Sequence, residues 1–340
     1  MPARDFAGEG FDAVDEDLLE TNSTSCDATA FVHQPYILGV TKHSVRIVWR
    51  TDYAGDSTIE YGPTPSLGTE IEAGVFGRNH VTEIGGLEPE TPYYYKVSTC
   101  GVESAVFPFR TAPERNTPFT FAVLGDNRSD PASYATVAAG IADAAPDIIL
   151  NTGDIVADGW RKEQFEEQFF GPVGDLYSET PVFVSIGNHE GESPYHYSRF
   201  PYKNSRAGYY AFRYGNTLFI SLNTNRLYLP GTPQYDWLVR VLSGASARTA
   251  EWIVVFAHHP AWSEGWDSPG YSGEWLLRYT VVPVLEQYGV DLYFCGHTHD
   301  YERGLRNGVT HIISGGADRR WIRFSRTFRT WWFRNSAITL

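Results

Sequence analysis

The sequence is short of basic side chains and has no long apolar run, and both shortages exclude a class of protein. No stretch approaches the roughly 18 consecutive apolar residues of a membrane-spanning helix. Lysine and arginine number 27 against 41 acidic residues, for a formal net charge of −14. That balance argues against a general nucleic-acid binder, because phosphate backbones attract basic surfaces. The three cysteines indicate nothing by their number alone.

The N-terminus also lacks the basic start and apolar core of a secretory signal. Either the protein is cytoplasmic, or a leader is not part of this chain. Cys26 and Cys100 could form a bridge between the N-terminal arm and a strand, and two unpaired thiols are the equal alternative. Cys295 ends an apolar segment, where a small thiol packs well.

The 340 residues suffice for about two domains of roughly 150 residues each. Residues 1–30 are polar and acidic and are expected to form a flexible arm. Residues 31–112 alternate short strands with Gly/Pro turns, which predicts an all-β sandwich. Val45, Ile47 and Trp49 fall on one face of its first clear strand. The turn and Tyr-rich strand at residues 87–97 resemble the tyrosine corner of fibronectin type III sandwiches.

After a polar linker the pattern changes to alternating strands and helices. This predicts a layered α/β domain over residues 117–318, with ligands at the carboxyl ends of a largely parallel sheet. Strands are expected at residues 119–124, 147–150, 181–186, 209–214, 218–222, 252–257, 292–295 and 311–314. Helices are expected at residues 134–144, 163–170, 233–242 and 275–288.

The tail at residues 319–340 alternates arginines with aromatic residues and contains no acid. It could contact an anionic or membrane surface. An edge strand with a basic wet face, or a shifted end of the reading frame, is favoured over that function.

Five polar blocks follow the apolar strands of the α/β part. They are Gly125-Asp126-Asn127-Arg128, Gly153-Asp154, Gly187-Asn188-His189-Glu190, His258-His259-Pro260 and Gly296-His297-Thr298-His299. Carboxylate, amide and imidazole donors suit hard divalent and trivalent ions. Asp154 is the natural bridge between two such ions. His297 and His299 lie on one side of an extended backbone, which suits adjacent metals. One block would be a weak signal, but five in order predict a dinuclear site for phosphate-ester hydrolysis.

These blocks resemble the calcineurin-like metallophosphoesterase superfamily. Together with the preceding sandwich, residues 35–316 resemble a purple acid phosphatase with a fibronectin-like N-terminal domain. The resemblance implies an αββα catalytic domain with a first metal on Asp126, bridging Asp154 and His299. The second metal would be bound by Asp154, Asn188, His258 and His297. His189 would lie near the scissile phosphate, with Glu190 orienting it.

Two departures concern the first metal. The family's colour-giving tyrosine is Ala157 here, and a histidine that other members place two residues after the first Asp is Arg128. The first metal is therefore one protein ligand short. Arg128 cannot ligate a metal, but its planar fork suits two phosphate oxygens, and a charge pair with Asp126 or Asp130 is the structural alternative.

The expected reaction is direct hydrolysis of a phosphate monoester by a hydroxide on two metal ions, either Fe, Zn or Mn. His189 would protonate the leaving oxygen or contact the phosphoryl group. His259 would touch substrate or hold His258 in place. The alternatives are a phosphodiesterase or nucleotide hydrolase of the same superfamily, and a catalytically weakened protein that binds a surface.

The partner is therefore expected to be a small phosphate ester or nucleotide, with no specific nucleic acid and no transmembrane segment. The resemblance implies a secreted or periplasmic protein, and a cytoplasmic location stays open. The sequence identifies neither the physiological substrate nor the oligomeric state.

Overall fold

The computed structural model describes residue 26 and residues 30–72, 76–202, 207–265 and 271–318. The predictions for the tail, and for the N-terminal arm apart from Cys26 and Ala30, lie outside these residues. Within the described part of the chain, no helix is long and apolar enough to cross a membrane.

The N-terminal part consists of two antiparallel sheets. One has the strand order β1 (Tyr36–Leu38), β2 (Ser44–Gly55) and β5 (Gly77–Gly85). The other has the order β4 (Thr69–Glu72), β3 (Thr58–Gly62), β6 (Pro92–Thr99) and β7 (Val102–Glu103), and β8 (Phe107–Arg110) pairs with β6. Val45, Ile47 and Trp49 are fully buried, as the alternation along β2 predicts.

Two contacts fix the ends of this part. The hydroxyl of Tyr93 accepts a hydrogen bond of 3.1 Å from the backbone N–H of Glu88, so the start of β6 is tied to the preceding turn. Cys26 and Cys100 form a disulfide, which ties the N-terminal arm to the turn after β6. Of the two alternatives open for these cysteines, the structure has the bridge.

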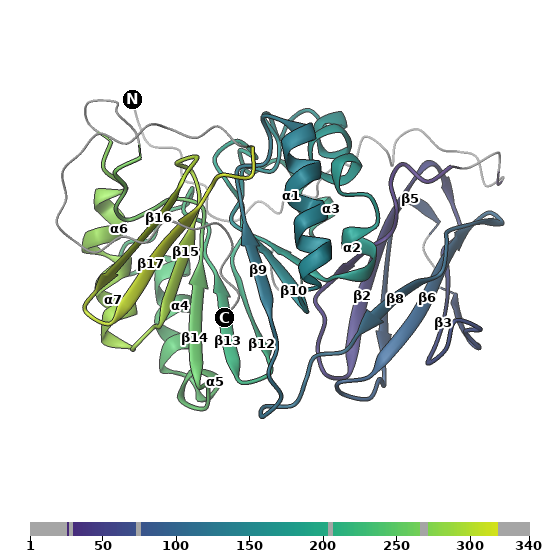
Figure 1. The fold of residues 1–340 in the computed structure, drawn as a ribbon, viewed down its shortest axis with the longest axis horizontal. Coiled ribbons are helices and arrows are strands. Elements are labelled where there is room, and N and C mark those ends of the chain that lie inside the picture. Colours follow the sequence, from purple (N-terminus) through teal and green to yellow (C-terminus); the bar gives the residue numbers. More distant parts are fainter. Residues whose placement is uncertain (1–25, 27–29, 73–75, 203–206, 266–270, 319–340) are drawn as a thin grey trace.

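The remainder contains two sheets (Figure 1). The first is parallel, with the order β11 (Val182–Val184), β10 (Ile148–Asn151) and β9 (Phe121–Leu124). The second is mixed, with the order β12 (Tyr210–Tyr214), β13 (Thr217–Ser221), β14 (Trp252–Phe256), β15 (Leu292–Cys295), β17 (Val309–Ser314) and β16 (Tyr301–Arg306). The ring of Phe121 meets Phe219 and Phe294 edge-on at 5.5 and 5.9 Å, so the sheets pack face to face.

Helices flank the paired sheets, with α6 and α7 beside the mixed sheet and α1, α2 and α3 on the side of β9 and β10 (Figure 1). The helical segments are α1 (Pro131–Ala144), the π-helix η2 (Phe165–Phe170), the 3-10 turn η3 (Gly171–Val173), α2 (Leu176–Glu179), α3 (Pro194–Arg199), α4 (Pro233–Ser243), α5 (Ala245–Arg248), α6 (Trp275–Tyr279) and α7 (Val281–Gln287). Asp130 caps α1 by accepting from the backbone N–H groups of Ala132 and Ser133.

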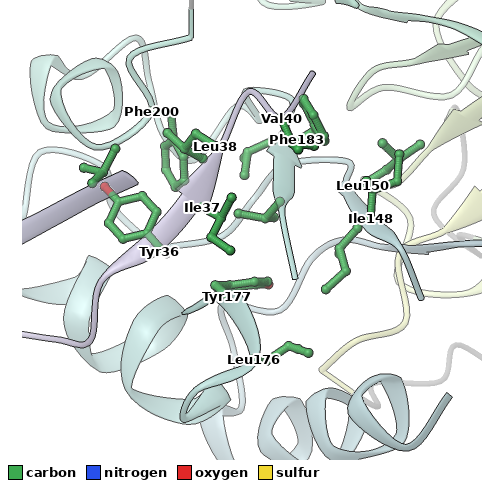
Figure 2. Packing of buried hydrophobic residues seen from close by; sticks show 14 of the residues in the cluster. Tyr36, Ile37, Leu38, Val40, Ile148, Leu150, Leu176, Tyr177, Phe183 and Phe200 are labelled. Atoms are coloured by element: carbon green, nitrogen blue, oxygen red, sulfur yellow. The ribbon is translucent and has the colours of Figure 1, made fainter. Parts of the chain in front are cut away.

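Strand β1 connects the two parts through one continuous hydrophobic cluster (Figure 2). The buried side chains of β1 lie among residues of α2, β10, β11 and the end of α3, namely Ile148, Leu150, Leu176, Tyr177, Phe183 and Phe200. Hydrogen bonds cross the same boundary, from the Tyr36 hydroxyl to the Arg199 carbonyl at 2.6 Å and from the Tyr95 hydroxyl to the Ser178 carbonyl at 2.9 Å. The N-terminal part is thus packed onto the sheets that carry the polar blocks.

Several elements differ from the sequence predictions, among them the short helices α2, α3 and α5, which were not predicted. Strand β16 was not predicted, because it lies at the sheet edge and carries few apolar residues. Its signal was the Asn307-Gly308 turn, where both residues have positive φ, as a two-residue hairpin requires. The single helix expected at residues 275–288 is divided into α6 and α7 at Thr280.

Candidate metal centre

The polar blocks meet at the carboxyl ends of the strands in both sheets. Asp126 follows β9 and Asp154 follows β10, which pair in parallel, and His258 and His297 follow the parallel strands β14 and β15. Parallel pairing places such ends at the same edge of a sheet. Face-to-face packing then brings the two edges together, so the predicted ligands converge from separate strands.

The backbone at this edge is strained. Asp126, Asp154 and His297 have φ of 58°, 55° and 70°, in the left-handed region that non-glycine residues rarely adopt. Such conformations cost on the order of 1–3 kcal/mol each and are concentrated at functional sites. A Cβ at Gly187 would lie 2.2 Å from Asp154 Oδ1, and one at Gly296 would lie 2.2 Å from Asp126 Oδ2. Only glycine allows these loops to approach so closely.

Three of the donor atoms predicted for the second metal lie close to the fourth, His258 Nε2. His258 Nε2 lies 3.3 Å from Asp154 Oδ2, 3.0 Å from Asn188 Oδ1 and 3.2 Å from His297 Nδ1. The donors of a tetrahedral site with bonds of about 2.0–2.1 Å lie roughly 3.3 Å from one another. The residues present therefore fit a metal ion in both chemistry and spacing.

The ring of His258 is held in a fixed orientation. Its Nδ1 lies 2.9 Å from the carbonyl oxygen of Thr152, to which Nδ1–H donates, so Nε2 faces the other donor atoms. Burial lowers the pKa of His258, but the Asp154 carboxylate outweighs it and raises that pKa to about 9. In the other direction, and against the effect of burial, His258 and Arg128 hold the pKa of Asp154 well below its usual range. The cluster thus stabilises a cation beside Asp154.

The donors predicted for the first metal also come together, but around a side chain. Asp126 is fully buried, and its Oδ2 accepts from the backbone N–H of His297 at 2.8 Å. Arg128 Nη1 lies 3.1 Å from Asp154 Oδ2, 3.1 Å from His299 Nε2 and 3.5 Å from Asp126 Oδ1. Asp126, Asp154 and His299 are therefore neighbours as predicted, with the guanidinium of Arg128 among them.

Glu190 does not take the expected role of orienting His189. Its two carboxylate oxygens accept backbone hydrogen bonds from Asp154 at 2.9 Å, Ile155 at 2.8 Å and Gly187 at 2.5 Å. Burial, with the charge of Asp154 added, raises the pKa of Glu190 to about 7. Glu190 therefore holds together the loop of the bridging carboxylate and the loop of Asn188.

His189 is fixed by the backbone instead. Its ring Nδ1 lies 2.7 Å from the carbonyl oxygen of Ala157, and its own backbone N–H donates to Asp154 Oδ1 at 2.9 Å. The side chain is 36% exposed, and Nε2 lies 3.1 Å from Arg128 Nη2. His189 is thus the accessible imidazole beside Asp154.

His259 lies beside the second site. Its ring centroid is 4.5 Å from that of His297 and 4.9 Å from that of His258. Its Nδ1 is 2.7 Å from Thr224 Oγ1, and burial together with the neighbouring imidazoles lowers its pKa. This position allows both predicted roles, contact with substrate and support of the ligand histidines.

One residue of the site was missed. Asp318 Oδ2 lies 2.8 Å from His299 Nδ1, on the far side of the ring from Asp126, and orients that imidazole. Asp318 follows β17 after Gly315, Gly316 and Ala317, so its signal resembles the pattern of a strand, a glycine and an aspartate at Asp126 and Asp154, with one alanine inserted.

Comparison with known proteins identifies relatives of this chain. The calcineurin-like phosphoesterase family matches residues 119–301. Purple acid phosphatase 18 of Arabidopsis thaliana is 31% identical over 323 residues, covering 82% of this chain and 69% of the relative. Probable purple acid phosphatase 20 of the same plant is 28% identical and covers 85% and 72%. The fold is similar to that of purple acid phosphatase PPD1 from yellow lupin (Lupinus luteus) seeds, with a TM-score of 0.75, 19% identity and coverage of 90% and 67%.

Proposed function

Because the chain belongs to the calcineurin-like phosphoesterase family, we propose that its metal centre hydrolyses phosphate monoesters with a metal-activated water. The protein is a phosphoric ester hydrolase of the purple acid phosphatase kind. The observation that supports metal-dependent hydrolysis most is the set of donors from Asp154, Asn188 and His297 within 3.3 Å of His258 Nε2. These are the residues that would hold the ion.

A metal ion there supplies a bound water of lowered pKa and a positive charge for the phosphoryl oxygens. Side chains of the protein supply proton transfer, charge stabilisation and positioning. His189 donates Nδ1–H to the Ala157 carbonyl, so Nε2 is the atom that can exchange a proton with the leaving oxygen. The guanidinium of Arg128, whose Nη2 lies 3.1 Å from His189 Nε2, would stabilise negative charge on a phosphoryl group bound beside that histidine. His259 positions the second-site imidazoles through its packing against His297.

The resemblance predicts two ions of Fe, Zn or Mn, and that count stays a prediction. The second site has its full set of protein donors in this chain. The first site has Asp126, Asp154 and His299 but lacks the tyrosine or histidine that the resemblance implies, because Ala157 and Arg128 stand in those places.

We also propose the predicted domain division, with a fibronectin type III-like sandwich at residues 31–112 and the catalytic domain at residues 117–318. The two antiparallel sheets and the tie from Tyr93 to Glu88 support the sandwich. The Cys26–Cys100 disulfide favours an oxidising, secreted or periplasmic compartment over the cytoplasm.

The test is hydrolysis of p-nitrophenyl phosphate against bis-p-nitrophenyl phosphate with added manganese, iron or zinc. We expect the monoester to have the higher kcat/KM, and Asn188→Ala to abolish turnover of both. A preference for the diester would support the alternative of a phosphodiesterase or nucleotide hydrolase. No turnover with any metal would support the weakened, surface-binding alternative.

A further inference from the structure

Arg128 lies among the three side chains that were predicted to bind the first metal ion. Its Nη1 is within 3.5 Å of one donor atom each of Asp126, Asp154 and His299. These are the three donors that the first site retains. Protein donors bind metals at about 2.0–2.2 Å. An ion at that distance from all three would occupy the space of the guanidinium nitrogen, so this arrangement accommodates one cation or the other.

The side chain is held in this place from both ends. The preceding residue, Asn127, is fully buried and donates from Nδ2 to the carbonyls of Ile155 and Gln168, each at 3.1 Å. At the other end, Arg128 Nη2 lies 3.1 Å from His189 Nε2. The Arg128 side chain is only 13% exposed. The Arg128 side chain is therefore a largely buried part of the centre and not a surface side chain.

The chemistry of the Arg128 guanidinium allows it to replace the charge of a metal ion. A guanidinium keeps its proton at every accessible pH and has no lone pair for a metal, so it brings the charge of a cation without ligating one. Two carboxylates and an imidazole around it provide the environment that a cation needs. No donor compensates at position 157, since the alanine side chain has none, and its backbone N–H donates to Gln168 Oε1 at 2.8 Å.

We propose that the Arg128 guanidinium takes the place of the first metal ion, so that the centre holds one divalent ion, on Asp154, Asn188, His258 and His297. This rests on the proposed function, since it assigns the composition of the same site. Asp154 then bridges a metal ion and a guanidinium, and a phosphate ester would meet one exchangeable and one permanent cation.

The test counts bound ions. Chelator-treated protein is dialysed against Mn²⁺ and analysed for metal content, and the electron paramagnetic resonance of the loaded protein reports whether two Mn²⁺ ions are close enough to couple. We expect one ion per chain and no coupling for the natural sequence. Arg128→His supplies the missing donor, and we expect two ions per chain with a coupled spectrum.

Matched variants distinguish the outcomes. Arg240→His makes the same exchange at an exposed position of α4 and should leave one ion. Arg128→Ala, which removes the cation without adding a donor, should admit a second, weaker ion, and it covers the case in which Arg128→His does not fold. Asn188→Ala should lose the single ion. Two coupled ions in the natural protein, or one ion in both folded Arg128 variants, would overturn the proposal while leaving the proposed function intact. No ion in the natural protein would overturn both.

Discussion

At the scale of single residues, the proposed roles divide the histidines of the centre between holding a metal and contacting the substrate. His189 contacts the backbone of Ala157 through one ring nitrogen and has the other near Asp154 Oδ2, at 3.9 Å. His297, by contrast, turns its Nδ1 toward His258 Nε2. The two histidines should therefore fail in different ways when they are removed.

His189→Ala should lower kcat for p-nitrophenyl phosphate by roughly 100-fold or more, since a positioned proton donor contributes about 10²–10⁴. Its metal content should equal that of the natural protein. His297→Ala should lose both the ion and turnover. The role of His189 is contradicted if His189→Ala keeps its kcat, or if it loses the metal ion together with activity.

Glu190 should matter for the metal without touching it. The carboxylate of Glu190 accepts hydrogen bonds from backbone N–H groups. A glutamine at this position would place its own NH₂ group, which is a donor, opposite some of these N–H donors. We expect Glu190→Gln to weaken Mn²⁺ binding and to lower the free energy of urea unfolding in chelator by about 1–3 kcal/mol. Glu167→Gln, on the exposed face of η2, is the control that should change neither. Equal Mn²⁺ affinity in natural and Glu190→Gln protein would show that Glu190 does not support the metal site.

At the scale of elements, the strand β1 packs the N-terminal part against the rest of the protein with only three residues. Its side chains are buried between the N-terminal sheets and the helices and strands of the catalytic part (Figure 2). Although β1 is an edge strand of its own sheet, its three side chains are all buried, which indicates that it lies in a core shared with the neighbouring elements.

Ile37→Ala should destabilise the protein by about 2–5 kcal/mol, because the removed atoms leave a cavity in a fully buried place. Val81→Ala on β5, where the side chain is 42% exposed, should cost about 0.5 kcal/mol or less. Urea unfolding followed by tryptophan fluorescence would measure both. Similar losses for the two variants would mean that β1 is not part of a shared core.

Strands and ligand blocks could be predicted because both have local signals. Apolar runs that end in a glycine and a polar residue identify Asp126, Asp154 and His297 from the sequence alone. The role of Glu190 could not be predicted in this way, since its partners Asp154 and Ile155 lie 36 and 35 residues away and contribute backbone groups that any sequence has. The place of Arg128 depends on His299, which is 171 residues away in the sequence. Such contacts follow from how the two sheets pack, which periodicity does not specify.

At the scale of the whole molecule, several buried histidines make stability depend on pH. The ring of His80 stacks on Trp49 and lies within hydrogen-bond distance of the Thr51 and Ser57 hydroxyls. Burial lowers its pKa to about 4, and burial lowers the pKa values of His196 and His311 to about 3 and about 4. Below pH 6.5 the unfolded chain binds protons that these folded residues exclude, so stability falls as the pH falls from about 6.5 toward 4.

His80→Gln should reduce this dependence. The natural protein should lose urea stability between pH 7 and pH 4.5 in chelator, and the variant should lose less of it, by roughly 1–3 kcal/mol. Comparison of the two slopes removes the contribution of the carboxylates, which titrate equally in both. Identical slopes would show that His80 is not kept neutral by the fold.

The most direct test of the whole account is the hydrolysis of p-nitrophenyl phosphate by chelator-treated protein as Mn²⁺ is added back. Metal chemistry at Asp154 predicts that turnover is absent after chelation and rises with Mn²⁺ until the site is full, while Asp154→Ala stays inactive throughout. Turnover that persists without metal, or that Asp154→Ala retains, would contradict it.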